Sequence, residues 1–170
     1  MRILGALLAG GQARRFGSDK AHARYRGWRL IDLVGDSLMA QCDGLVVCGR
    51  EEDGFTCIPD RPGPDMGPLG GIDAALHHAI EHGFDAVLSA ACDIPNLPPD
   101  LAATLAGDGA AIVQSQPVVG LWPVEVTDRL DNFLEQGGRK LFDFARLVDA
   151  RMTAFDPPLL NINRPEDLPE

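Results

Sequence analysis

The chain has 170 residues, of which 45% are hydrophobic and 24% charged, and its formal net charge is −10. This length and composition are typical of one globular domain with a sizeable core, so we expect a single domain over residues 1–170. The acidic balance argues against general nucleic-acid binding, and no run approaches the ~18 apolar residues of a membrane span.

The predicted elements alternate between strands and helices. Short apolar or β-branched runs predict strands at residues 3–8, 45–48, 56–58, 86–92, 110–114, 118–122 and 152–155. Apolar residues at helical spacing predict helices at residues 30–39, 72–80, 101–105, 130–136 and 141–148. This order predicts an α/β fold with a mainly parallel sheet and helices on both faces.

The cysteine pattern and the N-terminus favour a cytoplasmic protein. The four cysteines show no C-x-x-C spacing, so we expect reduced thiols rather than a zinc site or a disulfide framework. The first apolar stretch is too short for a signal peptide and leads straight into a glycine loop.

That glycine loop is the strongest functional signal in the sequence. Residues 7–20 read LLAGGQARRFGSDK, so the first predicted strand is followed by Gly10, Gly11, Arg15 and Lys20. Glycines allow close approach of the backbone to a phosphate, and the cations neutralise its charge. The spacing matches neither a Walker A loop nor a dinucleotide-binding fingerprint. The alternative is an ordinary glycine-rich turn with a solvated basic face.

Basic residues cluster after the first strand. Six of them fall within positions 14–29, with Asp19 as the only acid, and Lys20 is one of only two lysines in the chain. A local cationic patch on an acidic protein suits a small polyanion such as a nucleoside triphosphate. The alternative is a solvated surface on which charges cluster by chance.

Two carboxylates follow predicted strands. Asp60 follows the strand at 56–58, and Asp93 follows the strand at 86–92. In open α/β sheets, ligands bind beyond the carboxyl ends of the strands. Asp60 is therefore placed to accept hydrogen bonds from a base or a ribose, and Asp93 to bind Mg²⁺ beside a triphosphate. The alternative for each is a turn aspartate next to proline.

Two asparagines alternate near the end of the chain. Asn161 and Asn163 of NINRPEDL point to one side of an extended segment, and their amides offer donors and acceptors to a ligand. The alternative is an Asn turn before a helix that starts at Pro165.

Four segments, in this order, resemble motifs of the molybdenum cofactor guanylyltransferases. The loop at 8–20 resembles L-A-G-G-x-[SA]-x-R-[MF]-G-x-D-K, and the segments GPLGG (67–71), CDIP (92–95) and NINRPEDL (161–168) resemble the other three. This family belongs to the nucleotidyltransferases with a Rossmann-like three-layer fold. The resemblance implies transfer of GMP from GTP to molybdopterin, which forms molybdopterin guanine dinucleotide and pyrophosphate, with Mg²⁺ as cofactor.

The resemblance also implies roles for individual residues. GTP-binding residues would be Leu8, Ala9, Gly10, Gly11, Lys20, Asp60 and Asp93. Catalytic residues would be Arg15, Lys20 and Asp93, of which Asp93 is the metal ligand. Asn161 and Asn163 would lie toward molybdopterin. Other cofactor-biosynthesis proteins and recipient molybdoenzymes are candidate protein partners.

The chain departs from the family at three places. Cys48-Gly49-Arg50 stands where an Asn often helps to bind GTP, Arg164 replaces a Thr, and the loop before Pro117 is shorter than usual. Two alternative functions therefore stay open. One is a related nucleotidyltransferase that uses CTP or a sugar-1-phosphate, although L-A-G-G favours GTP. The other is a non-catalytic GTP-binding module.

The histidines are not expected to take part in chemistry. His77, His78 and His82 fall on or near one predicted helix, where a solvated or capping role is expected.

Overall fold

The computed structural model describes residues 1–10, 20–159 and 161–162. A seven-stranded sheet forms its centre. The strands lie in the order β5 (Cys57–Ile58), β4 (Gly44–Cys48), β1 (Ile3–Leu8), β6 (Ala86–Ala91), β8 (Gln116–Pro123), β7 (Ala111–Val113) and β9 (Arg151–Thr153). All neighbouring pairs are parallel except those of β8, which is antiparallel to both β6 and β7.

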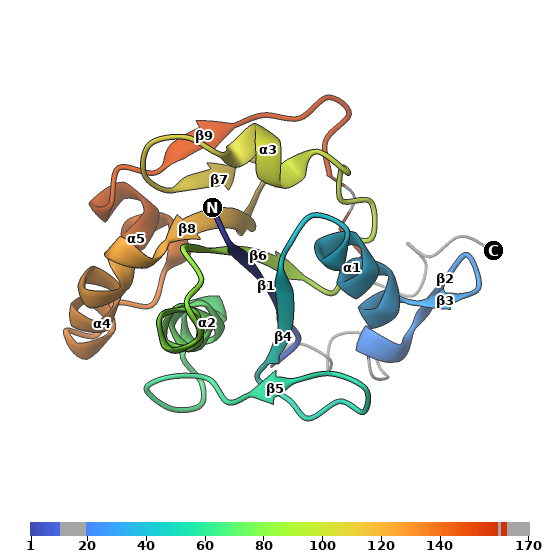
Figure 1. Cartoon of the computed structure of the whole chain (residues 1–170), viewed down its shortest axis with the longest axis horizontal. Helices are drawn as coiled ribbons and strands as arrows, with labels where there is room; N and C mark the ends of the chain where they lie inside the picture. Colours follow the sequence, from blue (N-terminus) through green and yellow to red (C-terminus); the bar gives the residue numbers. More distant parts are fainter. Residues whose placement is uncertain (11–19, 160, 163–170) are drawn as a thin grey trace.

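Helices cover both faces of this sheet, as the sequence predicts (Figure 1). One face carries α1 (Leu30–Met39) and α3 (Leu101–Leu105). The other face carries α2 (Pro68–His82), α4 (Thr127–Glu135) and α5 (Leu141–Leu147). Strand β1 supplies both cores, because Ile3 and Leu7 pack on the α1 side and Leu4 and Ala6 on the α2 side. The mainly parallel three-layer α/β fold is therefore confirmed.

Most predicted elements occur with small shifts at their ends. Helix α2 begins at Pro68, four residues before the predicted start at Ile72, because Pro at the first helical position lacks only an N–H that has no partner there. None of the described helices is both long and apolar enough to cross a membrane.

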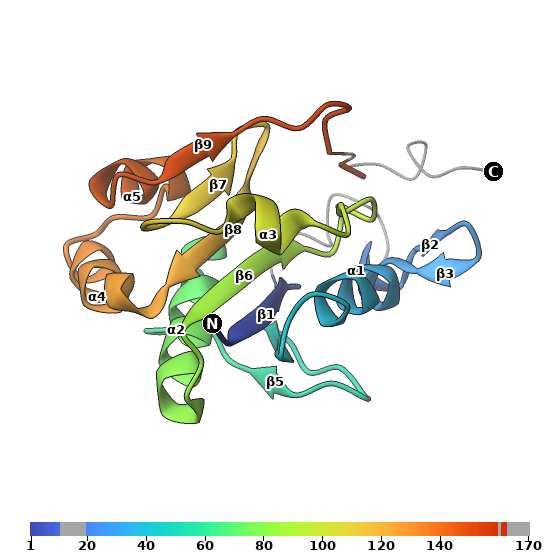
Figure 2. The ribbon, with the colours of Figure 1, turned by 45° about the horizontal axis from the view of Figure 1, so that its top comes forward.

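The sequence analysis missed a short hairpin. Strands β2 (Arg24–Tyr25) and β3 (Trp28–Arg29) pair through a two-residue turn at Arg26 and Gly27, which have φ angles of 53° and 87°. Positive φ at both central residues is the geometry of tight hairpin turns. Two-residue strands carry too little periodicity to be recognised. The hairpin projects beyond α1 (Figure 2).

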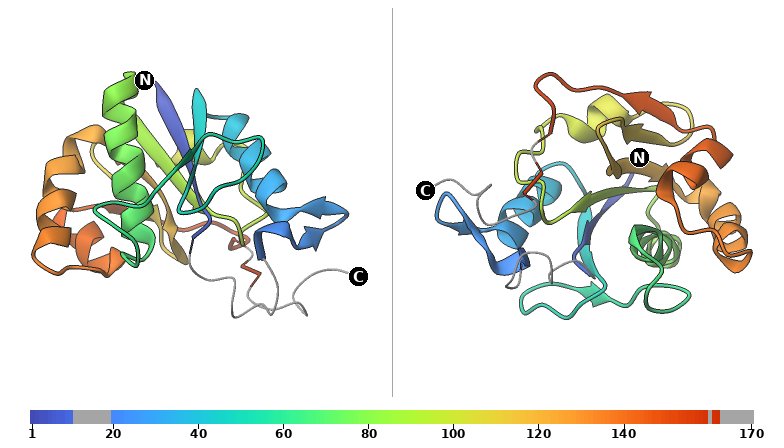
Figure 3. Two further views of the ribbon diagram at one scale, coloured as in Figure 1. Left: turned by 90° about the horizontal axis from the view of Figure 1, so that it is seen from below. Right: turned by 180° about the vertical axis from the view of Figure 1, so that it is seen from behind.

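The functional edge of the sheet is set by its parallel strands. Leu8 at the end of β1 lies opposite Cys48 of β4 and Ala91 of β6, so the three strands end in one row. Figure 3 shows these strands running toward the same end of the molecule. The described residues that follow them, Gly10, Gly49 and Cys92, therefore lie at one edge of the sheet.

A buried hydrogen-bonded pair fixes β6 against the antiparallel strand β8. Ser89 and Trp122 are both fully buried. The indole Nε1 of Trp122 donates to Ser89 Oγ at 2.9 Å, and Ser89 Oγ donates to the carbonyl of Val118 at 2.7 Å. Ser89 thereby provides a partner for the buried Trp122 Nε1 and for the carbonyl of Val118, both on β8.

We expect Ser89→Ala to lower the free energy of unfolding by about 1–3 kcal/mol, because it leaves the buried Trp122 Nε1 without its acceptor. Chemical denaturation checks this. Ser115→Ala, at an exposed position of the turn between β7 and β8, is the matched control and should change stability by less than about 0.5 kcal/mol. Equal effects of the two substitutions would contradict the role of Ser89.

Candidate active site

A cavity of about 750 Å³ lies at the carboxyl ends of β1, β4, β5 and β6. Its wall includes Leu8, Ala9 and Gly10 after β1, Gly49 and Arg50 after β4, Asp60 after β5, and Cys92 and Asp93 after β6. The start of α2 closes another side with Gly67, Pro68 and Gly71. This is the edge of an α/β sheet at which ligands bind.

Glycines allow the cavity wall to be this compact. A Cβ on Gly49, whose φ is +89°, would lie 3.1 Å from Asp60 Oδ1 and 3.1 Å from the Cα of Gly10. A Cβ on Gly71 would lie 2.7 Å from Leu8 Cδ2. The ends of β1 and β4 and the first turns of α2 therefore approach each other only because side chains are absent there.

Lys20 and Asp93 meet inside the cavity. Lys20 Nζ lies 3.2 Å from Asp93 Oδ2, and their side chains are 12% and 18% exposed. Lys20 begins a short 3-10 helix (Lys20–His22), and Asp93 follows β6. A cation and a carboxylate that the sequence predicts to contact the same triphosphate thus lie side by side at the same wall.

Asp60 lies next to the first turn of α2, because its Cβ would be 3.2 Å from a Cβ on Gly70. The following residue, Arg61, donates its backbone N–H to the carbonyl of Gly70 at 3.0 Å, which fixes this loop on the helix. The Asp60 side chain faces Gly49, as the short distance to a Cβ there shows. Burial raises the pKa of the Asp60 carboxyl above its ordinary value.

Cys48 does not replace the hydrogen-bonding role of the family's Asn. Cys48 is 1% exposed and contributes to the cavity lining, and its Cβ would lie 3.2 Å from a Cβ on Gly71. Burial raises the pKa of the Cys48 thiol, so it remains neutral. Burial also raises the pKa of Cys92 to about 11, with the neighbouring Asp93 as the next cause. The raised pKa values of both thiols disfavour the thiolate, which is the nucleophilic form.

Arg50 is a cavity residue that the sequence analysis did not single out. Its guanidinium Nη2 lies 3.3 Å from Glu52 Oε2, and the Glu52 side chain is only 6% exposed. The same carboxylate receives Arg29 Nη1 at 3.3 Å and His22 Nε2 at 2.7 Å. The run Glu51-Glu52-Asp53 after the second predicted strand was the signal available for this network.

The basic cluster is not one phosphate-binding patch. Of its described members, Lys20 lines the cavity. Arg29 is instead engaged by Glu52 and by Asp32, whose Oδ2 accepts from Arg29 Nε at 2.7 Å. Arg24 Nη1 donates to the carbonyl of Gly27 at 2.8 Å, within the hairpin. The prediction of a shared cationic patch is therefore wrong for these two arginines.

The C-terminal segment returns to the same edge of the sheet. The backbone N–H of Ile162 donates to the carbonyl of Asp93 at 2.8 Å, and the buried Ile162 side chain packs with Leu30. Asn161 Nδ2 lies 3.5 Å from Gln116 Oε1, while Asn161 Oδ1 is buried and accepts no hydrogen bond from the described part of the chain. Asn161 is not part of the cavity wall, but it is adjacent to the residue that binds Asp93.

The structure brings together most of the predicted site residues that it describes. These are Leu8, Ala9, Gly10, Lys20, Asp60 and Asp93, all of which line the one cavity. Gly11, Arg15 and Asn163 lie outside the described residues.

The expectation of a solvated or capping role is wrong for His77. Its Nε2 lies 3.0 Å from both carboxylate oxygens of Asp131 on α4. His82 fits the expectation, because it is exposed near the end of α2 and its Nδ1 lies 2.9 Å from the carbonyl of His78.

Sequence comparisons identify relatives over almost the whole chain. The MobA-like NTP transferase domain matches residues 5–151. Proteins named molybdenum cofactor guanylyltransferase from Cereibacter sphaeroides (strain ATCC 17029 / ATH 2.4.9) and Rhodobacter capsulatus are 36% and 37% identical. Each alignment covers 99% of this chain and 94% of the relative.

Comparison with solved structures identifies the same family and fold. The molybdopterin-guanine dinucleotide biosynthesis protein A from Archaeoglobus fulgidus superposes with a TM-score of 0.78 at 25% identity, covering 96% of this chain and 94% of that one. A 2-C-methyl-D-erythritol 4-phosphate cytidylyltransferase from Thermus thermophilus reaches a TM-score of 0.71 at 10% identity, over 95% and 93% of the two chains, which shows a shared fold alone. The chain therefore belongs to the MobA-like NTP transferases, and within them it is a nucleotidyltransferase of the molybdenum cofactor guanylyltransferase family.

Proposed function

We propose that this protein transfers GMP from GTP to molybdopterin, forming molybdopterin guanine dinucleotide and pyrophosphate. The observation that carries the proposal is the cavity in which Lys20 and Asp93 lie 3.2 Å apart at the ends of β1 and β6. The cavity combines glycines that allow a triphosphate to approach the backbone with the paired cation and carboxylate of Lys20 and Asp93. The names of the relatives supply the two substrates.

In the reaction, a terminal phosphate oxygen of molybdopterin forms a bond to the α-phosphorus of GTP. The bond from this phosphorus to the oxygen that bridges to the β-phosphate breaks, and pyrophosphate leaves with the electron pair. The protein contributes position and charge rather than a covalent intermediate. The Lys20 ammonium is placed to stabilise the negative charge that develops on the leaving pyrophosphate.

The site fits a Mg²⁺ ion. Mg²⁺ prefers one or two carboxylates together with phosphate oxygens and water, and the Asp93 carboxylate is part of the cavity wall. When bound, the ion neutralises charge on the phosphates of the nucleotide. Lys20 Nζ lies 3.2 Å from Asp93 Oδ2. In the proposed complex of Mg²⁺ and GTP, Asp93 therefore binds the metal ion while Lys20 binds a phosphate oxygen.

Guanine recognition is assigned to Asp60. Its carboxylate can accept from both the N1 and N2 groups of guanine, a pair of donors that cytosine does not present. The half-buried position beside Gly49 strengthens such hydrogen bonds, because water competes less there.

Molybdopterin is assigned to the side of the cavity next to the C-terminal segment, with Asn161 and Asn163 as contacts. The support is the hydrogen bond from the Ile162 N–H to the Asp93 carbonyl, which holds this segment beside the proposed metal ligand. Arg15 and Gly11 complete the proposed triphosphate contacts. We place the protein in the cytoplasm, with cofactor-biosynthesis proteins and recipient molybdoenzymes as candidate partners.

Lys20→Ala should weaken GTP binding by about 1.5–3 kcal/mol, because it removes a charge-assisted contact to a phosphate. Isothermal titration calorimetry with GTP and Mg²⁺ measures this. Lys140→Ala removes the other lysine of the chain, which is exposed beyond the cavity wall, and should leave the affinity unchanged. Equal GTP affinities of the wild type and Lys20→Ala would refute the triphosphate site.

Asp60→Asn should lower the ratio of kcat/KM for GTP to that for CTP by at least about tenfold, because an amide presents a donor to the guanine N2 group. Initial rates of pyrophosphate release with each nucleotide measure the ratio. Burial raises the pKa of Asp60, so the wild-type preference for GTP should also fall as the pH drops through a value above the ordinary carboxyl pKa. A wild type that turns over CTP and GTP equally would support the cytidylyltransferase alternative.

Asp93→Asn should abolish most turnover while GTP binding and folding persist, since the side chain is partly exposed and lies outside the core. Pyrophosphate release at saturating GTP, Mg²⁺ and molybdopterin is compared with the melting temperature. Asp53→Asn, at an exposed turn, is the control and should behave as wild type. Near-wild-type rates in Asp93→Asn would remove this residue from the mechanism, and a wild type that binds GTP without releasing pyrophosphate would indicate a binding module.

A further inference from the structure

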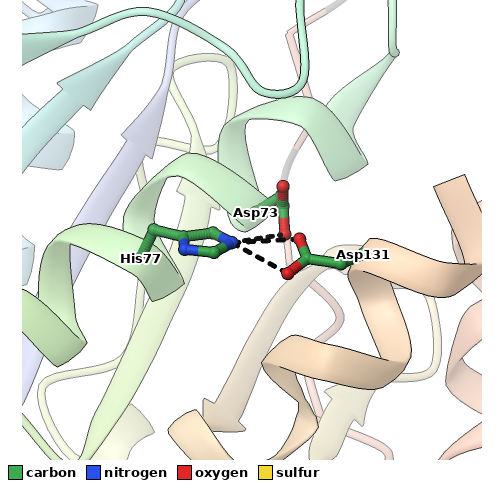
Figure 4. A group of neighbouring side chains, drawn as sticks. All are labelled: Asp73, His77 and Asp131. Carbon is green, nitrogen blue, oxygen red and sulfur yellow. Dashed lines mark hydrogen bonds and ion pairs between the residues drawn. The ribbon is translucent and has the colours of Figure 1, made fainter. Parts of the chain in front are cut away.

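Three side chains meet between α2 and α4, outside the cavity wall (Figure 4). Asp73 and His77 lie one helical turn apart on α2 and point the same way, and Asp131 faces them from α4. His77 Nε2 lies 3.0 Å from both oxygens of Asp131 and 3.8 Å from Asp73 Oδ1. One ligand atom from each residue can be chosen so that all lie within 4.8 Å of one another.

Burial of the Asp73 carboxylate costs desolvation free energy, and hydrogen bonds from the described residues do not compensate for it at Oδ1. The residue is 1% exposed, and its Oδ1, which faces His77, accepts no hydrogen bond from any described residue. A buried carboxylate oxygen without a partner is strongly disfavoured. The other oxygen, Oδ2, lies 3.7 Å from Nε of Arg61, whose side chain is 50% exposed. That distant, solvated cation does not satisfy Oδ1.

The spacing fits a tetrahedral metal ion. An ion with bonds of roughly 2.0–2.2 Å to nitrogen and oxygen needs ligand atoms roughly 3.3–3.6 Å apart. The observed separations from His77 Nε2, 3.0 Å to Asp131 Oδ1 and 3.8 Å to Asp73 Oδ1, lie on either side of this range. Because all three ligand atoms lie within 4.8 Å of one another, side-chain rotations would bring them onto one ion. With His77 28% exposed and Asp131 36% exposed, a water molecule has access to the fourth position.

We propose that Asp73, His77 and Asp131 form a second metal site, separate from the GTP cavity, for a borderline divalent ion such as Zn²⁺. An imidazole with two carboxylates suits such ions, whereas Mg²⁺ prefers oxygen ligands alone. The bound ion satisfies Asp73 Oδ1 and balances two neighbouring carboxylates. A proton shared between Asp73 and Asp131 is the competing occupant.

The position of the site gives it a structural consequence. Asp73 follows directly on the turn of α2 that carries Gly71 in the cavity wall, and Arg61 beside it follows Asp60. An ion bound by Asp73, His77 and Asp131 would join α2, whose first turns form part of the cavity wall, to α4 on the same face of the sheet. Metal binding should therefore raise the melting temperature in proportion to the logarithm of free metal concentration, without a requirement for GTP.

The test is a Co²⁺ and Zn²⁺ titration of the full chain after removal of metals with a chelator, in excess Mg²⁺ and without nucleotide. We expect one equivalent of Co²⁺ to give the visible absorption bands of a four-coordinate nitrogen and oxygen site, and Zn²⁺ to displace it. Absence of saturable binding in the wild type would overturn the proposal. So would a thiolate-to-cobalt charge-transfer band, which would assign the metal to cysteines.

Two variants identify the ligands. His77→Gln and Asp131→Asn should each weaken Zn²⁺ binding by at least about tenfold and abolish the metal-dependent rise in melting temperature. The matched control is His78→Gln, which changes the neighbouring histidine of the same helix, and it should bind as the wild type does. Circular dichroism verifies that the variants are folded. Wild-type affinity in either ligand variant would overturn the proposed ligand set.

Discussion

The parallel register that places Leu8 opposite Cys48 and Ala91 is the constraint on which the active site depends. Because the three strands end in one row, Gly10, Gly49 and Asp93, which follow them, line the same cavity. Any slip of β1 by one residue would exchange its two faces and move Gly10 away from Gly49. The buried side chains of β1 prevent such a slip, since Ile3 and Leu7 belong to one core and Leu4 and Ala6 to the other. Stability of the sheet and geometry of the site thus have the same origin.

Much of this arrangement could be predicted from the sequence, because it depends on local pattern. Short apolar runs between glycine and proline turns identified the strands, and the residues after them were the site candidates. The hairpin around Gly27 was missed because two-residue strands have no readable period. Pairings between distant residues were also invisible. Nothing near Arg29 indicated that Glu52 would engage it, and the spacing of Asp73 and His77 did not reveal Asp131 as the third member.

Charge distribution explains how an acidic chain can bind a polyanion. The Glu52 carboxylate, whose side chain is only 6% exposed, lies 3.3 Å from Nη2 of the cavity residue Arg50, so this cation is ordered before a ligand arrives. Asp93 does the same for Lys20. A phosphate that enters then exchanges one anionic partner for another, which avoids the entropy cost of ordering long side chains during binding. Selectivity for a triphosphate arises from this local arrangement and not from net charge.

Cys48 stands where the family often has an Asn that helps to bind GTP, so under the proposed function base recognition depends more strongly on Asp60. Cys48 is 1% exposed, and its thiol is a weaker hydrogen-bond donor than an amide. The tight contact among Gly10, Gly49 and Asp60 leaves the Asp60 carboxylate as the polar side chain nearest to this junction. Under the proposed function, discrimination between bases depends on the Asp60 carboxylate, which is already partly desolvated in the folded protein. An incorrect base would leave this half-buried carboxylate without a partner, so the partial desolvation that raises its pKa would also disfavour the wrong nucleotide.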